Sequence, residues 1–302
     1  MPQTAPSPLV HLIAGPTASG KSQRALHLAE AVGGTIVNAD AIQLYRDLSV
    51  LSARPSAEDE ARAPHRLYGV ADGAEAWSVG RWVRAAAPVL AELAVEGKPA
   101  IVTGGTGLYF RALTAGLADI PDVALEVRQA ATARFDAEGE AAFSARLSAV
   151  DPAAEAGIAS GDRQRLVRAM EVFEATGRPI SVWRRETRPL LERGTWRAEV
   201  IEPPRDVLYA RCDARFTAMV EAGAVEEAEA LAARGLAPDL PVMKAVGLRE
   251  LLAWRRGEIG REAAIALGQQ ETRRYAKRQL TWFRNQTPDW PRLAPQAQEG
   301  PR

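Results

Sequence analysis

Short apolar runs separated by longer amphipathic segments characterise the first third of the chain. Residues 9–14, 35–38 and 99–103 form runs that are long enough for a buried strand and too short for a helix. Between them, apolar residues recur at helical spacing over residues 22–31 and 77–93. Strands that alternate with helices in this way predict an α/β fold, in which a parallel sheet is flanked by helices.

The pattern changes after Gly116. Residues 121–185 contain no run typical of a buried strand, and they are rich in alanine and arginine at helical spacing. A strand-like run returns at 197–201, and helical sequence then continues to about residue 284. We therefore predict a P-loop-type α/β core formed by residues 1–115 and 196–286, a small all-helical insertion domain at 116–195, and a flexible tail at 287–302, which is rich in proline and glutamine.

The charge of the 302-residue chain is balanced, with 38 basic and 38 acidic side chains. A surface that is basic all over is therefore excluded, and any nucleic-acid site must be local. The single cysteine, Cys212, excludes an intramolecular disulfide and argues against a cysteine-based metal site. No apolar run approaches the ~20 residues that span a bilayer, and residues 1–8 do not resemble a signal peptide. We expect a cytoplasmic protein with no membrane attachment.

A glycine-rich motif follows the first predicted strand. Gly15-Pro-Thr-Ala-Ser-Gly-Lys-Ser22 matches G-x-x-x-x-G-K-[ST], with a strand before it and a helix after it, as a P-loop requires. Backbone N–H groups and the positive end of the next helix would surround a phosphate, Lys21 would add a mobile cation, and the Ser22 hydroxyl would bind Mg²⁺. The predicted polyphosphate site comprises Gly15, Pro16, Thr17, Ala18, Ser19, Gly20, Lys21 and Ser22.

Two further features lie where the next predicted strands end. Asp40 follows the run at 35–38, where it would hold a metal ion, act as a base or cap a following helix. A nucleotide triphosphatase usually closes a second strand with an aspartate, whereas the run at 99–103 ends in Gly104-Gly105. The same turn brings Thr106 to this edge of the sheet, either as a ligand contact or as the N-cap of the next helix.

The chain resembles the tRNA dimethylallyltransferase family in seven motifs. In order they are Gly15-Pro-Thr-Ala-Ser-Gly-Lys-Ser22, Asp40-Ala-Ile-Gln-Leu-Tyr45, Pro64-His-Arg-Leu67, Gly104-Gly-Thr-Gly-Leu-Tyr-Phe110, Asp162-Arg-Gln-Arg-Leu-Val-Arg168, Ala245-Val-Gly247 and Lys277-Arg-Gln-Leu-Thr-Trp-Phe-Arg284. One motif alone would carry little weight, but seven in this order span nearly the whole chain. Two departures are Ala41, where the family usually has serine, and Leu51-Ser-Ala-Arg-Pro55, where it usually has Gly-Thr-Ala-Lys-Pro.

The resemblance implies transfer of a dimethylallyl group from dimethylallyl diphosphate to the exocyclic N6 of the adenosine on the 3′ side of the anticodon, in tRNAs that read codons beginning with U. It implies Mg²⁺ as the cofactor, with Ser22 as its P-loop ligand. Asp40 would accept the N6 proton or a hydrogen bond from N6, Thr106 would contact the bridging oxygen, and an arginine would stabilise the leaving group. Arg211 and Arg215 both match that arginine, one helical turn apart, and the sequence does not choose between them.

Local basic density supports an RNA partner, expected to be the anticodon stem-loop, from which the target base must be extruded. Residues 244–284 contain ten basic and four acidic side chains, and residues 161–188 contain seven and four. On the predicted helix at 271–284, Arg273, Lys277 and Arg284 fall near one face, with Arg274 and Arg278 beside them. The plain alternative is a solvated charged face.

On the same helix, Leu280 and Phe283 can face the core. Gln43, three residues after Asp40, is expected to contact the edge of the target adenine, and Arg128 matches a family contact to tRNA within the insertion. The predicted tRNA contacts are Asp40, Ala41, Ile42, Gln43, Thr106, Arg128, Gln164, Arg165, Arg168, Lys244, Gly247, Arg249, Lys277, Arg278, Gln279 and Arg284.

Three other functions remain to be tested. A small-molecule or nucleoside kinase would use the same P-loop core, with residues 161–165 as an arginine-rich lid over ATP. An adenylate dimethylallyltransferase would prenylate free AMP, which does not need the basic helix near the C-terminus. An RNA-binding module without catalysis would not explain an intact P-loop with Asp40 and Thr106 at the same edge. We expect a monomer.

Overall fold

The computed structural model describes residues 10–118 and 120–295. The described chain divides into two compact units, of which one comprises residues 10–114 and 191–295, and the other residues 115–118 and 120–190. Each unit is considered by itself. Among the described residues, no helix combines the length and the apolar character needed to cross a bilayer.

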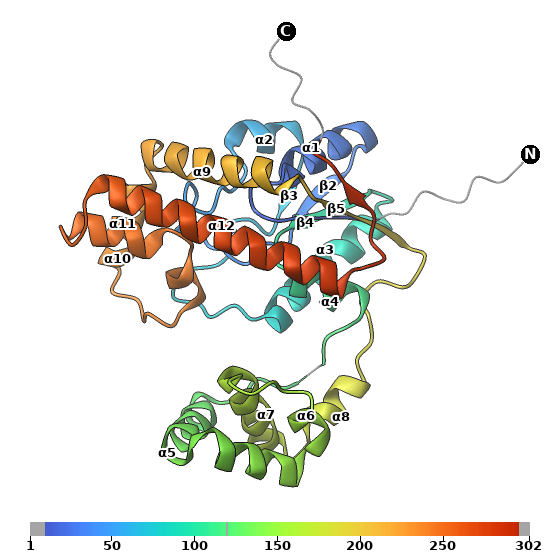
Figure 1. Ribbon diagram of the computed structural model, residues 1–302. Coiled ribbons are helices and arrows are strands. Elements are labelled where there is room, and N and C mark those ends of the chain that lie inside the picture. The colour runs from blue at the N-terminus through green and yellow to red at the C-terminus, as the bar shows by residue number, and fades with distance from the viewer. Residues whose placement is uncertain (1–9, 119, 296–302) are drawn as a thin grey trace, which may run out of the picture. The chain divides into compact units, whose positions relative to one another are not determined.

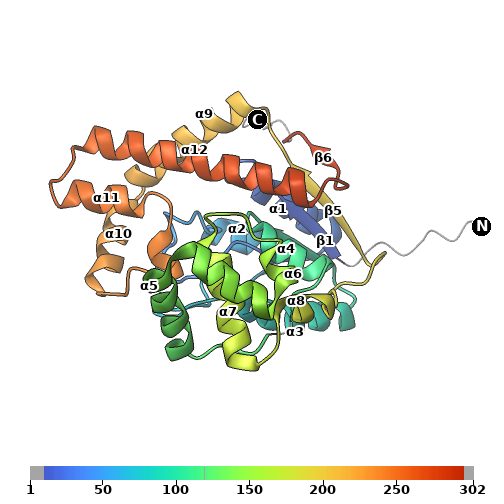
Figure 2. The same cartoon turned by 60° about the horizontal axis from the view of Figure 1, so that its bottom comes forward.

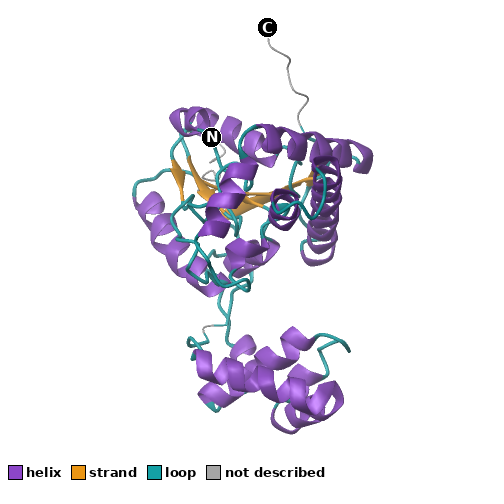
Figure 3. Cartoon of the chain, turned by 90° about the vertical axis from the view of Figure 1, so that its left-hand side faces the viewer, coloured by secondary structure: helices purple, strands orange, loops and turns teal. Residues whose placement is uncertain are grey.

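A six-stranded parallel sheet forms the centre of the first unit (Figure 3), which confirms the predicted fold class. The strands are β1 (Val10–Ala14), β2 (Thr35–Asn38), β3 (His65–Arg66), β4 (Ala100–Gly104), β5 (Trp196–Ile201) and β6 (Arg292–Leu293), in the order β3-β2-β4-β1-β5-β6. The four long strands lie at the predicted runs; β4 is shifted by one residue, β5 begins one residue earlier, and Leu9 lies outside the described residues. The edge strands β3 and β6 were not predicted, because two residues create no periodicity.

The long strands are apolar on both faces, as buried parallel strands require. On one face, Ile13, Ile36 and Ile101 pack against α1 (Lys21–Val32). On the other face, Leu12 and Val102 belong to a larger core that includes side chains of α3 (Val79–Val95) and α4 (Gly107–Thr114). The helix α2 (Ala57–Arg62) lies in the connection between β2 and β3 and begins with a capping box at Ser56.

Helices after β5 complete this unit. They are α9 (Arg205–Glu221), α10 (Ala224–Ala233), the 3₁₀ turn η1 (Pro241–Lys244), α11 (Leu248–Arg255) and α12 (Arg261–Gln286). The long helix α12 packs along α9 and α11 and also contacts α4 (Figures 1 and 2). Close packing around Phe216 of α9 depends on glycine, because a Cβ at Gly268 or Gly247 would lie 2.1 Å or 2.3 Å from its ring.

The prediction of a flexible tail from residue 287 was wrong for residues 287–295, while 296–302 lie outside the described residues. Thr287 is buried, and β6 pairs with β5 through hydrogen bonds such as that from Glu202 N to the Leu293 carbonyl, 2.8 Å long. Trp290 packs against Phe110 and Trp196. The sequence did not predict this segment because it is rich in proline, and because a two-residue strand and one tryptophan create no periodic pattern.

The second unit is all-helical. It contains α5 (Leu125–Val150), α6 (Pro152–Glu155), α7 (Arg163–Thr176) and α8 (Ile180–Arg185), drawn in green to yellow in Figure 1. Phe143, Leu147 and Met170 lie in a hydrophobic core of its own. Residues 121–185 form no strand, as the sequence predicted, and α5 is interrupted at Gly139, where φ is 77°.

Candidate active site

The P-loop connects β1 to α1 at the carboxyl end of the sheet, where open α/β sheets bind their ligands. Ala18 and Gly20 adopt left-handed backbone conformations, with φ of 61° and 93°, and such residues allow successive N–H groups to point into one concavity. Ser19 is fully buried, and its Oγ has no hydrogen-bond partner in the described part of the chain. The loop is therefore shaped for an anion and retains an unused donor.

Lys21 is the cation of this loop. Its side chain is buried, and Nζ donates a 3.1 Å hydrogen bond to the Pro16 carbonyl. Burial lowers the pKa of Lys21 to about 8, an effect that the negative charge of Asp40 partly offsets and the positive charge of Arg215 enhances. The P-loop therefore contains one buried ammonium group, and the charge of Asp40 is close enough to act on it.

Hydrogen bonds join the loop after β2 to the loop after β4. Thr106 N donates to the Ala39 carbonyl at 3.2 Å, and Ala41 N donates to Thr106 Oγ1 at 3.0 Å. Gly104 has no room for a side chain, because a Cβ would lie 2.1 Å from the Ala39 carbonyl oxygen. Thr106 Oγ1 accepts from the neighbouring loop, so its own hydrogen remains available to donate to a ligand.

Asp40 is positioned by the fully buried side chain of Asn38. Asn38 Oδ1 accepts from Asp40 N at 2.7 Å, and Asn38 Nδ2 donates to the carbonyl of Asp40 at 3.0 Å. One carboxylate oxygen of Asp40 accepts from Ile42 N at 3.1 Å in a local turn. No helix begins after Asp40 until α2 starts at Ala57, so the alternative of a helix cap is excluded.

The structure places both candidate arginines of α9 near the P-loop. Arg215 is half-buried, and burial lowers its pKa while the negative charge of Asp40 raises it. Arg211 also approaches the P-loop, with a guanidinium nitrogen 3.8 Å from the Cβ position of Gly20. Both arginines line one cavity of about 540 Å³. Its lining residues are Ala18, Gly20, Gln23, Arg24, Ile201, Arg211, Arg215, Leu293, Ala294 and Pro295.

A buried side chain of α12 reaches the same loops. Gln279 accepts a 2.9 Å hydrogen bond from Thr17 N and donates a 2.9 Å hydrogen bond to the Gly105 carbonyl. Its side chain therefore faces the protein interior in this structure. Gln279 was predicted to contact tRNA, and the packing of α12 turns this position toward the loops and away from solvent.

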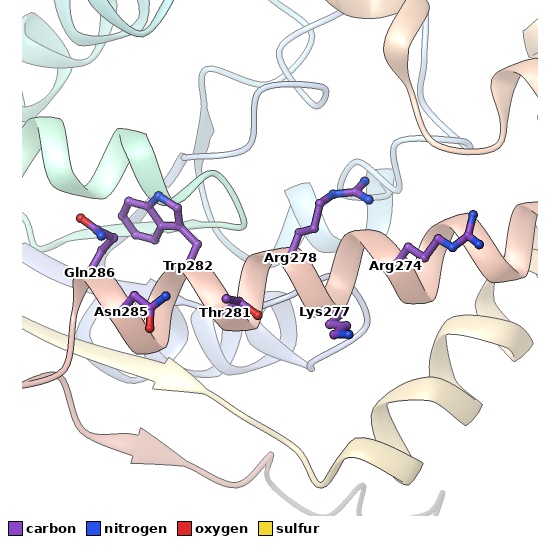
Figure 4. Close-up of a pocket in the computed structure, with 7 residues that line it drawn as sticks. All are labelled: Arg274, Lys277, Arg278, Thr281, Trp282, Asn285 and Gln286. Atoms are coloured by element: carbon purple, nitrogen blue, oxygen red, sulfur yellow. The ribbon is translucent and has the colours of Figure 1, made fainter. Parts of the chain in front are cut away.

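A neighbouring face of α12 carries a shallow basic groove of about 470 Å³. Figure 4 shows its lining side chains along the helix, with Arg274 and Arg278 on the same side as Trp282. The groove is lined by Arg274, Lys277, Arg278, Thr281, Trp282, Asn285 and Gln286. Lys277 and Arg278 are exposed, as a site for RNA phosphates requires.

Comparisons with known proteins agree with this geometry. Residues 43–286 match a family model described as IPP transferase, and residues 8–74 match one described as isopentenyl transferase. The chain belongs to the IPP transferase family. It is 59% identical to a protein named tRNA dimethylallyltransferase from Phenylobacterium zucineum, over 97% of this chain and 95% of the relative. Identity to a protein of the same name from a Caulobacter species is 56%, over 95% and 93% of the two chains.

A solved structure is also similar. The tRNA isopentenylpyrophosphate transferase from Bacillus halodurans is 31% identical, with a TM-score of 0.66, over 94% of this chain and 89% of that one. The resemblance noted in the seven motifs is thus confirmed at the level of family and fold.

Two other basic residues of α12 that were predicted to face RNA form ion pairs within the protein. Arg273, placed on the basic face by the sequence, forms an ion pair with Asp213 of α9. Arg284 forms an ion pair with Glu202, 2.5 Å apart. The Arg284 side chain nevertheless stays exposed, and Arg274 also has an acidic partner, Glu271, so an ion pair alone does not remove an arginine from the surface.

The loop after Asp40 holds three of the predicted contacts. Gln43 Nε2 donates to the carbonyls of Ser52 and Ala53 at 3.0 and 2.8 Å, so this nitrogen is engaged within the protein. Ala41 and Ile42 are partly exposed beside it. The absence of a hydroxyl at Ala41 leaves the loop intact, because its backbone N–H bonds Thr106.

In the helical unit, Arg128 and Arg168 share the buried carboxylate of Glu171, at 3.7 and 2.5 Å. Gln164 and Arg165 are exposed at the start of α7. The prediction places all four at an RNA surface, and the ion pairs fix the directions of the first two guanidinium groups.

The remaining predicted contacts lie at the end of η1, at the start of α11 and in the turn between them. Lys244 and Arg249 are exposed, with 85% of the Arg249 side chain accessible. Gly247 is buried, and its φ of 87° and the nearby ring of Phe216 explain the glycine by packing. Gly247 therefore offers no side chain to RNA but shapes the turn that presents its neighbours.

Sequence reasoning missed Asn38 and Glu227 as positioning residues. Asn38 ends a buried strand, and a polar residue at such a place is a usable signal, because a buried amide must find partners. Glu227 of α10 accepts hydrogen bonds from the backbone N–H groups of Ser49, Val50 and Leu51. No sequence signal marks Glu227, because its partners are about 180 residues away along the chain.

Proposed function

We propose that this chain transfers a dimethylallyl group from dimethylallyl diphosphate to N6 of the adenosine on the 3′ side of the anticodon in tRNAs that read codons beginning with U. The observation that carries the proposal is the convergence of Lys21, Asp40, Thr106 and Arg215 at one sheet edge, in a chain of this family. Relatives named tRNA dimethylallyltransferase support the choice of substrate.

The reaction forms one bond and breaks one bond. The N6 lone pair attacks the allylic carbon that carries the diphosphate, the bond between this carbon and oxygen breaks, and its electron pair leaves with the diphosphate. Asp40 accepts the proton that N6 loses. Its Oδ1 accepts from Ile42 N, and its Oδ2 accepts no hydrogen bond from the described residues. Lys21, Arg215 and the Thr106 hydroxyl stabilise the charge that develops on the leaving oxygens.

A magnesium ion fits the donor set. Mg²⁺ binds phosphate oxygens, waters and one or two protein oxygens, and it does not require a cage of side chains. Ser22, exposed at the first turn of α1, and Asp40 would hold the ion against the diphosphate. When bound, Mg²⁺ would neutralise charge on the leaving group.

The partner is the anticodon stem-loop, and the exposed basic groove of α12 is the surface we assign to its phosphates. Since one chain supplies the P-loop, Asp40 and the basic groove, we propose that it works as a monomer. The proposed RNA substrate implies that it works in the cytoplasm.

Incubation with labelled dimethylallyl diphosphate, unmodified tRNA and Mg²⁺ tests the proposal. We expect label in the tRNA at a single adenosine, which nuclease digestion would locate. A reaction with labelled ATP and candidate small-molecule acceptors tests the kinase alternative, which the glycines at the end of β4 disfavour. Phosphoryl transfer without prenyl transfer would replace the proposed function with a kinase.

A further inference from the structure

One buried amide connects α12 to both glycine-rich loops of the donor site. Gln279 bonds the backbone at Thr17 in the P-loop and at Gly105 in the loop that carries Thr106, with both distances at 2.9 Å. Thr17 and Gly105 precede Gln279 by 262 and 174 residues. Replacing the side chain with an apolar one would leave a buried N–H and a buried carbonyl unpaired, which is costly.

The same helix also presses directly on the second loop. A Cβ at Gly105 would lie 2.1 Å from the Gln279 amide nitrogen, and a Cβ at Gly107 would lie 2.1 Å from the ring of Trp282. Both glycines are therefore explained by the close approach of α12. Any displacement of this helix must move Gly105 to Gly107, and Thr106 lies between them.

Trp282 belongs to both sides of this contact. Its ring covers Gly107, and it also lines the basic groove together with Lys277 and Arg278 (Figure 4). An α-helix keeps its hydrogen-bonded geometry when it shifts, so the groove face and the Gln279 face of α12 move as one body. Burial raises the pKa of Tyr275, and the charge of Asp40 adds to that effect, so α12 also borders the proposed base.

We infer that Gln279 is a positioning residue that couples RNA binding in the α12 groove to the geometry of the P-loop and of the Thr106 loop. RNA on the groove would hold α12 against both loops, and a filled P-loop would hold α12 in the position that fits RNA. Diphosphate and RNA therefore bind cooperatively, and by linkage each raises the affinity of the other by the same factor. This inference rests on the proposed function.

The test uses inorganic pyrophosphate and an anticodon stem-loop RNA, so that no reaction occurs during the measurement. Calorimetry gives the pyrophosphate Kd of the full chain with Mg²⁺, in the absence and presence of saturating RNA. We expect RNA to tighten pyrophosphate binding by about fivefold or more, the lower end of typical coupling between sites. In Gln279→Met, which has similar length but cannot make either hydrogen bond, we expect this factor to fall close to one.

Two further variants separate the hydrogen bonds from packing. Gln279→Glu keeps the shape and the acceptor for Thr17 N but cannot donate to the Gly105 carbonyl, and we expect it to lose the coupling too. Gln270→Met is the matched control, since Gln270 is half-buried on the same helix and lies outside the groove lining. It should keep the coupling of the unmodified chain. Thermal unfolding of each variant confirms that it is folded.

The outcomes discriminate clearly. Coupling lost in both Gln279 variants and kept in Gln270→Met supports the inference. A chain that binds both ligands without coupling, or a Gln279→Glu protein that couples normally, would overturn it and leave the proposed function standing. A chain that binds neither pyrophosphate nor RNA would remove the proposed function and the inference together.

Discussion

The two basic regions of the α/β unit are built in opposite ways. In the donor site, Lys21 is buried and Arg215 half-buried, and hydrogen bonds in the core position the loops around them. In the α12 groove, Lys277 and Arg278 are exposed on a helix surface. Charges in a water-poor site act strongly on a transition state, whereas exposed charges are screened by salt. The first region is suited to chemistry and the second to binding a polyanion.

This contrast makes a general prediction. Changes in the donor site should alter the rate of the chemical step or donor affinity, with weak dependence on salt. Changes in the groove should alter RNA affinity and its dependence on salt while leaving the chemical step intact.

The largest effect is expected at Asp40. Asp40→Asn preserves size and most of the hydrogen bonds around the carboxylate but removes the base. Single-turnover prenyl transfer at saturating substrates should fall by about 10²–10⁴-fold, the usual contribution of a general base. Affinities for pyrophosphate and for RNA should remain near those of the unmodified chain.

A titration with Mg²⁺ distinguishes the two remaining roles of Asp40. If the carboxylate mainly anchors the metal, excess Mg²⁺ should restore much of the rate in Asp40→Asn. A general base cannot be replaced in this way. Turnover near that of the unmodified chain at ordinary Mg²⁺ would remove Asp40 from the catalytic residues.

The next effect concerns Lys21. Lys21→Ala removes the buried cation of the P-loop and should weaken pyrophosphate binding roughly a hundredfold, as expected for a charge paired out of water. RNA affinity in the absence of diphosphate should not change. Lys98→Ala is the control, because Lys98 is exposed and pairs with Glu96. An equal loss of RNA affinity in Lys21→Ala would contradict the separation of the two regions.

The pKa of Lys21 predicts a pH dependence. Because burial lowers this pKa to about 8, the side chain is charged at pH 7 and largely neutral at pH 9 in the free protein. Only the charged form attracts diphosphate, so affinity should fall as pH rises through 8, by roughly tenfold between pH 7 and pH 9. The ratio of Kd values for Lys21→Ala and the unmodified chain cancels the ionisation of pyrophosphate itself. A ratio that stays constant over this range would show that Lys21 does not titrate there.

The groove should respond differently. Lys277→Ala combined with Arg278→Ala should weaken RNA binding about tenfold at low salt and make the slope of log K against log salt shallower by about 1.5. The control is Arg255→Ala combined with Arg256→Ala, which changes net charge equally but removes exposed side chains of the α11 region that pair with Glu229 and Glu258. Equal effects in the two double variants would mean that net charge, and not this groove, binds RNA.

Local patterns predicted much of the donor site. The P-loop and the turn at Thr106 are contiguous in sequence, and each is set by a strand that is followed by glycine, so both were predictable at their positions. Leu280 and Phe283 were expected to face the core, and both are buried. Such features depend on spacing along one segment, which the sequence records directly.

The rest depends on partners that are distant in sequence. Gln279 turns inward because backbone groups at Thr17 and Gly105 need partners, and its own segment gives no sign of this. On the same helix, Arg273 and Arg284 pair with Asp213 and Glu202, which lie 60 and 82 residues away in sequence. Only the assembled core decides which acidic side chains the arginines of a helix contact.

The smallest effect should come from Glu227, which touches neither region's ligand. Its carboxylate accepts hydrogen bonds from three successive backbone N–H groups at residues 49–51, and the following carbonyls of Ser52 and Ala53 hold Gln43. Glu227→Gln replaces one acceptor oxygen with a donor that faces an N–H group, which should loosen this turn. Since the loss is that of about one hydrogen bond, we expect kcat for prenyl transfer to fall about threefold.

Glu226→Gln, at an exposed neighbouring position, is the control. The pyrophosphate Kd and the salt slope of RNA binding should both stay unchanged. The loop after Asp40 is expected to contact the target adenine, and it is part of neither the P-loop nor the α12 groove. A change in pyrophosphate affinity instead of kcat would show that Glu227 acts through the P-loop and not through the turn that holds Gln43.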